Sequence, residues 1–202
     1  MSPIVVFDLG KVLVDFDYSI AARKIAALSS KPIQNLHDFL SNSPLLVQLE
    51  TGLITSEQFF FEVRKATGFG GNATDFLGYF ADIFTPMPEM VELHAGLRKK
   101  NIPTYIFSNT NDIAIGHIRH NFPFFGQFDG YILSYEIGAM KPRPKIYEAL
   151  EAMSGRRGGD IFYIDDRLEN VEAGAARGWQ IVLHESPDAT RIALEKYLLT
   201  RV

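Results

Sequence analysis

The fold is decided by a stretch near the start of the chain, IVVFDLGKVLVD at residues 4–15. Its first four residues, Ile4 to Phe7, are all apolar, and such a run is typical of a β-strand that is buried on both faces. The strand ends at Asp8, and open α/β sheets carry their chemistry at the carboxyl ends of their strands. Asp8 is therefore a candidate functional residue, although aspartate also caps turns and helices.

A helical region follows this strand. After an extended segment, Val12-Leu13-Val14, apolar residues recur at intervals of three and four from residue 20 onward, and this spacing indicates a helix. Further helices are predicted at about 33–41, 44–51, 55–68 and 74–83. No β-rich stretch interrupts the region. Residues 16–85 are therefore predicted to form an all-α insertion.

Short apolar strands alternate with helices from residue 86 to the end of the sequence. The strands are predicted at 104–107, 130–134, 161–164 and 180–183. The helices are predicted at about 88–100, 111–121, 144–153, 168–177 and 188–200. This alternation predicts a doubly wound α/β fold with a parallel sheet and right-handed crossovers. Segments 1–15 and 86–202 then form one Rossmann-like core, into which 16–85 is inserted.

The composition excludes several classes of protein. A net charge of -4 over 202 residues gives no basic surface for nucleic acid. The absence of cysteine rules out a disulfide framework and a thiol nucleophile. No apolar run approaches the ~18 residues of a membrane span, and a strand that begins at Ile4 leaves no room for a signal peptide. We therefore expect a cytoplasmic protein without nucleic-acid or membrane partners, whose oligomeric state the sequence leaves open.

Polar side chains follow the predicted strands at the points where the strands end. They are Asp8, Ser108-Asn109 and Asp165-Asp166, together with Lys141 from a loop on the same side. Because the carboxyl ends of parallel strands share one edge of a sheet, we expect these side chains to converge. Clustered carboxylates repel one another unless a cation lies among them. Oxygen ligands without cysteine or clustered histidine favour a hard ion, which predicts Mg²⁺.

This set of residues suits phosphoryl transfer through an aspartyl-phosphate. A carboxylate attacks phosphorus in line, and Mg²⁺ bridges that carboxylate to a phosphate oxygen. A lysine, a hydroxyl group and backbone N–H groups neutralise the charge that spreads over the equatorial oxygens. The partner expected from this chemistry is a small phosphorylated metabolite.

Four segments of the chain resemble, in order, the four motifs of the haloacid dehalogenase-like (HAD) hydrolases. They are Phe7-Asp8-Leu9-Gly10, Phe107-Ser108-Asn109-Thr110, Lys141-Pro142 and Ile164-Asp165-Asp166. The resemblance covers nearly the whole chain, and the insertion at 16–85 is similar to the helical C1 cap of that family. Within the family, the chain looks closest to the branch that contains bacterial α-D-glucose-1-phosphate phosphatase.

The resemblance implies a role for each motif residue. Asp8 would be the nucleophile and a Mg²⁺ ligand, and Lys141 would tie the nucleophile to the phosphate. Ser108 would bind the phosphoryl group with help from the amide of Asn109. The other metal contacts implied are the backbone carbonyl of Gly10, Asp166 as a direct ligand, and Asp165 through water, with Asn170 supporting them from behind.

Gly10 departs from the common pattern of the family, in which a second aspartate stands two residues after the nucleophile. That residue protonates the leaving group and activates water, and glycine can do neither. General acid–base catalysis contributes typically ~10²–10⁴-fold, so a slow enzyme, a substitute acid or a good leaving group is expected. Lys11 and Asp15 are the candidates for a substitute. A sugar 1-phosphate fits the case of a good leaving group.

The expected function is therefore a Mg²⁺-dependent phosphomonoester hydrolase that acts on a small sugar phosphate such as a hexose 1-phosphate. One alternative on the same fold is a metal-independent 2-haloacid dehalogenase, which also uses an aspartate nucleophile but has no need of the pair Asp165-Asp166. The other alternative is a catalytically weak protein that binds a phosphorylated ligand.

Overall fold

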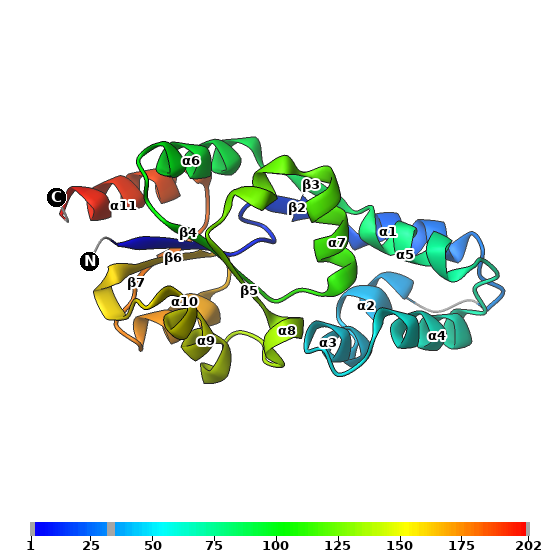
Figure 1. The fold of residues 1–202 in the computed structure, drawn as a ribbon. Helices are drawn as coiled ribbons and strands as arrows, with labels where there is room; N and C mark the ends of the chain where they lie inside the picture. The colour runs from blue at the N-terminus through cyan, green and yellow to red at the C-terminus, as the bar shows by residue number, and fades with distance from the viewer. Residues whose placement is uncertain (1–2, 32–34, 201–202) are drawn as a thin grey trace.

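The computed structural model describes residues 3–31 and 35–200. Figure 1 shows a sheet covered by helices on both faces and, beside it, a separate group of helices. Predictions that fall on residues 1–2, 32–34 and 201–202 lie outside the described residues, and these include the first residues of the helix expected at 33–41.

The core is built on a five-stranded sheet of order β5-β4-β1-β6-β7. Every neighbouring pair of its strands is parallel, so the predicted doubly wound α/β fold is confirmed. The strands are β1 (Ile4–Phe7), β4 (Thr104–Ser108), β5 (Gly130–Leu133), β6 (Ile161–Asp165) and β7 (Gln180–Leu183). The stretch that opens the chain thus forms the central strand.

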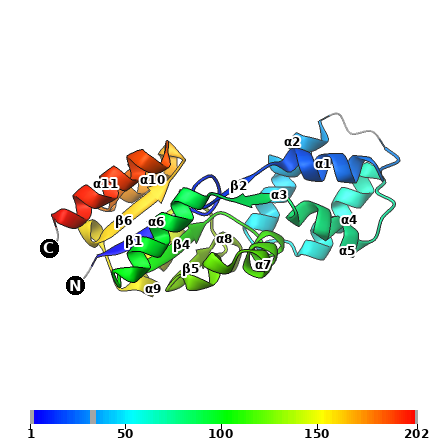
Figure 2. The same cartoon turned by 90° about the horizontal axis from the view of Figure 1, so that it is seen from above.

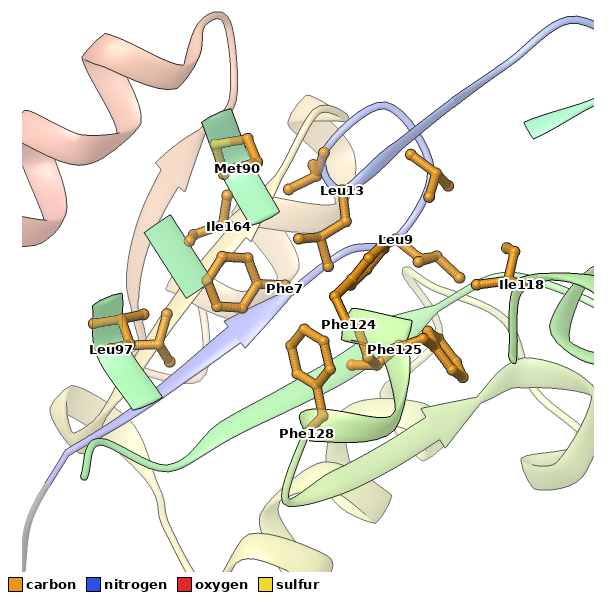
Figure 3. Close-up of a cluster of buried hydrophobic side chains, with 14 of the residues drawn as sticks. Phe7, Leu9, Leu13, Met90, Leu97, Ile118, Phe124, Phe125, Phe128 and Ile164 are labelled. Atoms are coloured by element: carbon orange, nitrogen blue, oxygen red, sulfur yellow. The ribbon is translucent and has the colours of Figure 1, made fainter. Parts of the chain in front are cut away.

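Side chains of β1 alternate between two hydrophobic clusters, one on each face of the sheet. Val5 and Phe7 belong to the first cluster, and Ile4 and Val6 belong to the second. Figure 3 shows Phe7 packed among the aromatic and aliphatic side chains of the first cluster. Because successive residues of a strand point to opposite faces, a strand buried on both sides needs the unbroken apolar run seen in the sequence.

Helices cover both faces of this sheet. Figure 1 shows α6 and α11 on one face and α9 and α10 on the other. Their bounds are α6 (Pro88–Lys99), α9 (Pro144–Ser154), α10 (Leu168–Ala175) and α11 (Pro187–Leu199). Two further helices and two 3-10 turns complete the core, namely α7 (Asp112–Asn121), α8 (Ser134–Ile137), η1 (Pro123–Gln127) and η2 (Gly158–Asp160). In the described parts of the chain, no helix has the length and apolar character that crossing a membrane requires.

The inserted helices form a group with a hydrophobic cluster of their own. They are α1 (Tyr18–Ala26), α2 (Leu36–Ser41), α3 (Pro44–Glu50), α4 (Ser56–Thr67) and α5 (Ala73–Ala81). Side-chain caps begin several of them: Ser43 caps α3, and Thr55 forms a capping box with Gln58 at the start of α4. Figure 2 shows the group extending away from the sheet.

A two-stranded antiparallel ribbon joins this group to the core. It pairs β2 (Val14–Phe16) with β3 (Phe84–Pro86). The extended segment expected at 12–14 is wrong for Val12 and Leu13, because the N–H groups of Leu13 and Val14 both donate to the carbonyl of Leu9 and close a turn. The extended backbone therefore begins only at Val14.

Candidate active site

The carboxyl ends of β1, β4 and β6 meet at one edge of the sheet. Asp8 directly follows β1, Ser108 ends β4 and Asp165 ends β6. Lys141 reaches the same place from the loop between α8 and α9. The edge borders a cavity of about 470 Å³, whose opposite wall comes from the inserted helices.

Lys141 contacts groups at all three strand ends. Its ammonium group lies 3.0 Å from Asp8 Oδ1 and 2.6 Å from Asp165 Oδ2, and it donates to the carbonyl of Phe107 at 2.8 Å. The side chain is 1% exposed, so the cation is held by protein groups rather than by water. These three contacts fix its nitrogen beside the Asp8 carboxylate.

Asn109 holds the backbone of Lys141. Its Oδ1 accepts from the Lys141 N–H at 2.7 Å, and its Nδ2 donates to the Lys141 carbonyl at 3.0 Å. The side-chain amide of Asn109 is thus engaged in positioning the lysine, which leaves its backbone amide as the group suited to the expected phosphate contact. Ser108 is buried beside it, and its hydroxyl makes a weak contact of 3.3 Å with the Asn109 carbonyl.

Asp165 accepts hydrogen bonds at both of its oxygens. Oδ1 accepts from the Arg167 N–H and from Asn170 Nδ2, each at 2.9 Å. Oδ2 accepts from Lys141 and from the hydroxyl of Tyr163. Burial opposes ionisation of this carboxyl, but Lys141 and the hydrogen bonds keep its pKa below the usual range. Asp165 is therefore an ionised group that orients its neighbours.

The other two carboxyl groups are harder to ionise. Burial raises the pKa of Asp8 to about 8, with Lys141 opposing the rise and the charges of Asp165 and Asp166 adding to it. Burial and the charge of Asp165 likewise raise the pKa of Asp166. The single positive charge of Lys141 thus does not balance the negative charges of Asp8, Asp165 and Asp166.

The donor set fits a magnesium ion. Asp8, Asp165 and Asp166 each offer a carboxylate oxygen, and these oxygens all lie within 4.8 Å of one another. Mg²⁺ prefers oxygen ligands, and a divalent cation would supply the positive charge that the raised pKa values of Asp8 and Asp166 call for. Because both oxygens of Asp165 already accept hydrogen bonds, Asp8 and Asp166 are the better direct ligands.

Gly10 also lines the cavity, and glycine has no side chain that could donate a proton. A Cβ added at Gly10 would lie 2.9 Å from the ring carbon Cε1 of Phe16. The expected substitutes, Lys11 and Asp15, form an exposed ion pair with each other. The hydrogen bond from Lys11 lowers the pKa of Asp15, so Asp15 is ionised at neutral pH and cannot donate a proton.

The inserted helices were expected to close over the substrate, but none of the residues that form this wall was predicted individually. Its side chains are Tyr18, His37, Ser41, Asn42, Leu46 and Glu50. Arg167, from the loop before α10, lines the cavity on the core side. Each of these residues reads as an ordinary helix or loop position, because no short motif marks a residue that reaches the site only through the packing of two distant segments.

The chain is similar to known proteins along most of its length. The model of the haloacid dehalogenase-like hydrolases matches residues 3–178. A D-ribitol-5-phosphate phosphatase of Bacteroides thetaiotaomicron is 24% identical over 186 residues, which cover 87% of this chain and 88% of that protein.

Solved structures show the same fold. A HAD-family enzyme of Bacteroides thetaiotaomicron, solved with magnesium and inorganic phosphate, matches with a TM-score of 0.80 and 25% identity over 90% of this chain and 93% of that one. An L-2-haloacid dehalogenase of Xanthobacter autotrophicus matches with a TM-score of 0.61 and 17% identity, over 100% of this chain and 84% of that one. At that identity, the second match concerns the fold alone.

Proposed function

The chain belongs to the haloacid dehalogenase-like hydrolases, and from this premise we propose that it is a Mg²⁺-dependent phosphatase that hydrolyses a small sugar or sugar-alcohol phosphate. The observation that carries the proposal is the position of Asp8, which lies at a strand end with Lys141 at 3.0 Å and two further carboxylates close by. The ribitol-phosphate phosphatase and the magnesium–phosphate complex among its relatives support the same chemistry.

The proposed reaction begins with Asp8. Its carboxylate attacks phosphorus and forms an aspartyl-phosphate, and the alcohol leaves from the opposite side. Lys141 holds the nucleophile and places its positive charge beside the phosphoryl group, and the hydroxyl of Ser108 and the backbone N–H of Asn109 donate to the phosphoryl oxygens. Water then cleaves the acyl phosphate and releases inorganic phosphate and free Asp8.

The metal ligands proposed are Asp8, Asp166 and the backbone carbonyl of Gly10, with Asp165 acting through water. A bound Mg²⁺ supplies positive charge that offsets the negative charge of the phosphoryl group and of the nucleophile as they approach each other. Asn170 donates to Asp165 at 2.9 Å and so keeps that carboxylate in a fixed orientation. Lys141 donates to the other oxygen of Asp165 and holds the same carboxylate in place.

The cavity supports a small, hydroxylated substrate. Its volume is about 470 Å³, and the wall opposite Asp8 carries the polar side chains of Tyr18, His37, Ser41 and Asn42. The Ser41 hydroxyl is buried without a hydrogen-bond partner in the described part of the chain, and an unmet buried hydroxyl favours a ligand that can bond to it. We propose that residues 16–85 act as a cap over the core, 1–15 and 86–202, with a hexose 1-phosphate or a polyol phosphate between the two.

The dehalogenase alternative is disfavoured by Asp166. A halide displacement at carbon needs no cation, yet this acid lies beside Asp8 and Asp165 without an ion-pair partner in the described chain. The two functions differ in their need for metal. Removal of Mg²⁺ with EDTA abolishes the phosphatase activity proposed here, and it leaves a metal-independent dehalogenase unchanged.

The test is a phosphate-release screen with hexose 1-phosphates, hexose 6-phosphates, ribitol 5-phosphate, nucleoside monophosphates and p-nitrophenyl phosphate, with and without Mg²⁺. Replacing the nucleophile by Asp8→Asn is expected to lower kcat by more than about 10³-fold. The control is Asp188→Asn, an exposed acid on α11, which should retain full activity. Full activity in Asp8→Asn, or a wild-type protein that hydrolyses no phosphomonoester, would overturn the proposal.

A further inference from the structure

The active site needs a proton donor for the leaving group, and the positions near the nucleophile do not provide one. Gly10 has no side chain, and its Cβ position is crowded by Phe16. Lys11 and Asp15 are paired with each other. An alkoxide without a proton is a poor leaving group, so the cleavage of a sugar or polyol ester calls for an acid from elsewhere in the cavity.

Four carboxyl groups of the described chain line the cavity: Asp8, Asp17, Glu50 and Asp166. Asp8 and Asp166 belong to the nucleophile and metal site. Asp17 caps α1, and its hydrogen bonds from Ser19 lower its pKa. The carboxyl of Glu50 makes no hydrogen bond or ion pair with another described residue. Of the four acids, it is the one without a role in helix capping, in nucleophilic attack or in the metal site.

Glu50 is fixed relative to the phosphate-binding loop although it belongs to the inserted helices. It is the last residue of α3, and its carbonyl oxygen lies 2.5 Å from the hydroxyl of Ser134 at the start of α8. The Ser134 hydroxyl also accepts from the N–H of Thr110 at 2.9 Å. Thr110 lies two residues beyond Ser108, so one side chain connects the Glu50 backbone with the loop that holds the phosphoryl group.

The environment of Glu50 leaves its carboxyl partly protonated near neutrality. Burial raises the pKa of Glu50 to about 7, and the charge of Arg167 opposes the rise. The phenol of Tyr18 lies close by on α1; burial raises the pKa of this phenol, and an ionised Glu50 would raise it further. The other titratable groups that line this cavity lie on the inserted helices, at the start of the chain and at the sheet edge; they are His37, Asp17, Lys11, Asp8, Lys141 and Asp166. A carboxylic acid of this strength suits proton donation at neutral pH.

We propose that Glu50 is the general acid of the reaction and takes the place of the aspartate that is absent at Gly10. This role rests on the phosphatase activity proposed above. As Asp8 bonds to phosphorus, the bond from phosphorus to the ester oxygen breaks, and the Glu50 proton passes to that oxygen, so that a neutral alcohol leaves. The Glu50 carboxylate then takes a proton from the water that cleaves the aspartyl-phosphate, and Glu50 returns to its starting state.

The experiment compares two substrates that differ in their need for a proton. Ribitol 5-phosphate is a primary alkyl ester whose alcohol must be protonated as it leaves. p-Nitrophenyl phosphate releases a stable phenolate that needs no proton. The measured quantity is kcat/KM, because it reports the steps up to the departure of the alcohol and excludes the later hydrolysis of the aspartyl-phosphate. The variant is Glu50→Gln, which keeps the size of the side chain and resembles the protonated acid.

Glu50→Gln is expected to lower kcat/KM for ribitol 5-phosphate about 10²-fold or more, and to change kcat/KM for p-nitrophenyl phosphate less than about 3-fold. For the wild-type protein, kcat/KM for ribitol 5-phosphate divided by kcat/KM for p-nitrophenyl phosphate should fall as the pH rises through the Glu50 pKa, because the acid loses its proton. The ratio in Glu50→Gln should not change over that range. The matched control is Glu57→Gln, an exposed acid in the first turn of α4, which should behave as wild type with both substrates.

Equal losses on both substrates, or a loss confined to KM for ribitol 5-phosphate, would show that Glu50 only shapes or lines the site and would overturn the proposal. The same holds if wild-type protein hydrolyses p-nitrophenyl phosphate but no alkyl phosphate. Wild-type protein that hydrolyses neither substrate with Mg²⁺ would instead overturn the proposed function, so the two failures can be distinguished.

Discussion

At the scale of single residues, the Phe16 ring packs against Gly10, two residues after the nucleophile, and leaves no room there for a side chain. The Phe16 ring lies where a side chain at position 10 would begin. It packs against Tyr18 and Phe84 with ring centroids 5.8 and 6.1 Å away, and the Lys11 ammonium lies 4.6 Å from its centroid. An aromatic cluster at the base of the inserted helices therefore fixes the ring that excludes a side chain at position 10.

Gly10→Ala is expected to lower the free energy of unfolding by about 1–2 kcal/mol, because the added methyl group forces the Phe16 ring out of its place. In a Phe16→Leu background, the same change should be neutral or slightly stabilising, since alanine also reduces the entropy of the unfolded chain. A double-mutant cycle by denaturant unfolding measures the difference. The same cost of Gly10→Ala in both backgrounds would contradict the steric explanation.

At the scale of elements, strands with a long apolar run can be predicted from the sequence, whereas very short strands and helices cannot. Strands β1, β4 and β6 are predictable because their buried runs are bounded by polar residues. In the ribbon of β2 and β3, only Val14 was expected to be extended, since each strand has only three residues and three residues show no periodicity. Their pairing joins Asp15 to Thr85, a contact that no local pattern reveals. Helix α8, with four residues, is missed for the same reason.

A contact between α8 and the end of α3 leads to a second prediction. Ser134→Ala removes the hydroxyl that bridges the Glu50 carbonyl, on the inserted helices, and the Thr110 N–H, in the core. Leaving buried backbone groups without their partner should lower the free energy of unfolding by ~1–3 kcal/mol. Hydrogen exchange should also become faster at the end of α3.

The control for Ser134 is Ser56→Ala. Ser56 also links the inserted helices to the core, through Asp112 on α7, but this contact is exposed to solvent. Water replaces an exposed hydrogen bond, so Ser56→Ala should cost less than about 0.5 kcal/mol. Equal effects of the two variants on the free energy of unfolding would mean that the Ser134 bridge does not fasten the two parts of the molecule.

At the scale of the whole molecule, the site is half predictable. Asp8, Ser108, Lys141 and the pair Asp165-Asp166 were expected to converge, because a parallel sheet brings strand ends to one edge, and the geometry places them there. The inserted helices were expected to cover the substrate, but no residue of the facing wall, Glu50 included, could be named from the sequence. This wall depends on how the inserted helices pack over the edge, and packing between distant segments leaves no mark in local periodicity.

His94 connects the helix layer of the core with the sheet. It lies on α6 and is 1% exposed. Its ring stacks on Phe128 with centroids 3.9 Å apart and meets the edge of Phe7 at 6.0 Å. Nε2 lies 3.1 Å from the Thr104 hydroxyl, whereas Nδ1 has no hydrogen-bond partner in the described chain. Burial lowers the pKa of His94 to about 4; the charge of Arg98 lowers it further, and that of Asp129 opposes the shift.

The lowered pKa makes the stability of the fold depend on pH. Between pH 6.5 and 4, the unfolded chain binds a proton at His94 that the folded protein does not bind, so the free energy of unfolding falls as the pH is lowered. The full contribution is present above pH 6.5, and its loss amounts to up to about 3 kcal/mol. His94→Gln cannot bind this proton, and its stability should therefore decline less than that of wild type over the same interval. Denaturant unfolding at pH 7, 5.5 and 4 measures both curves, and parallel curves would mean that other groups cause the acid sensitivity of the core.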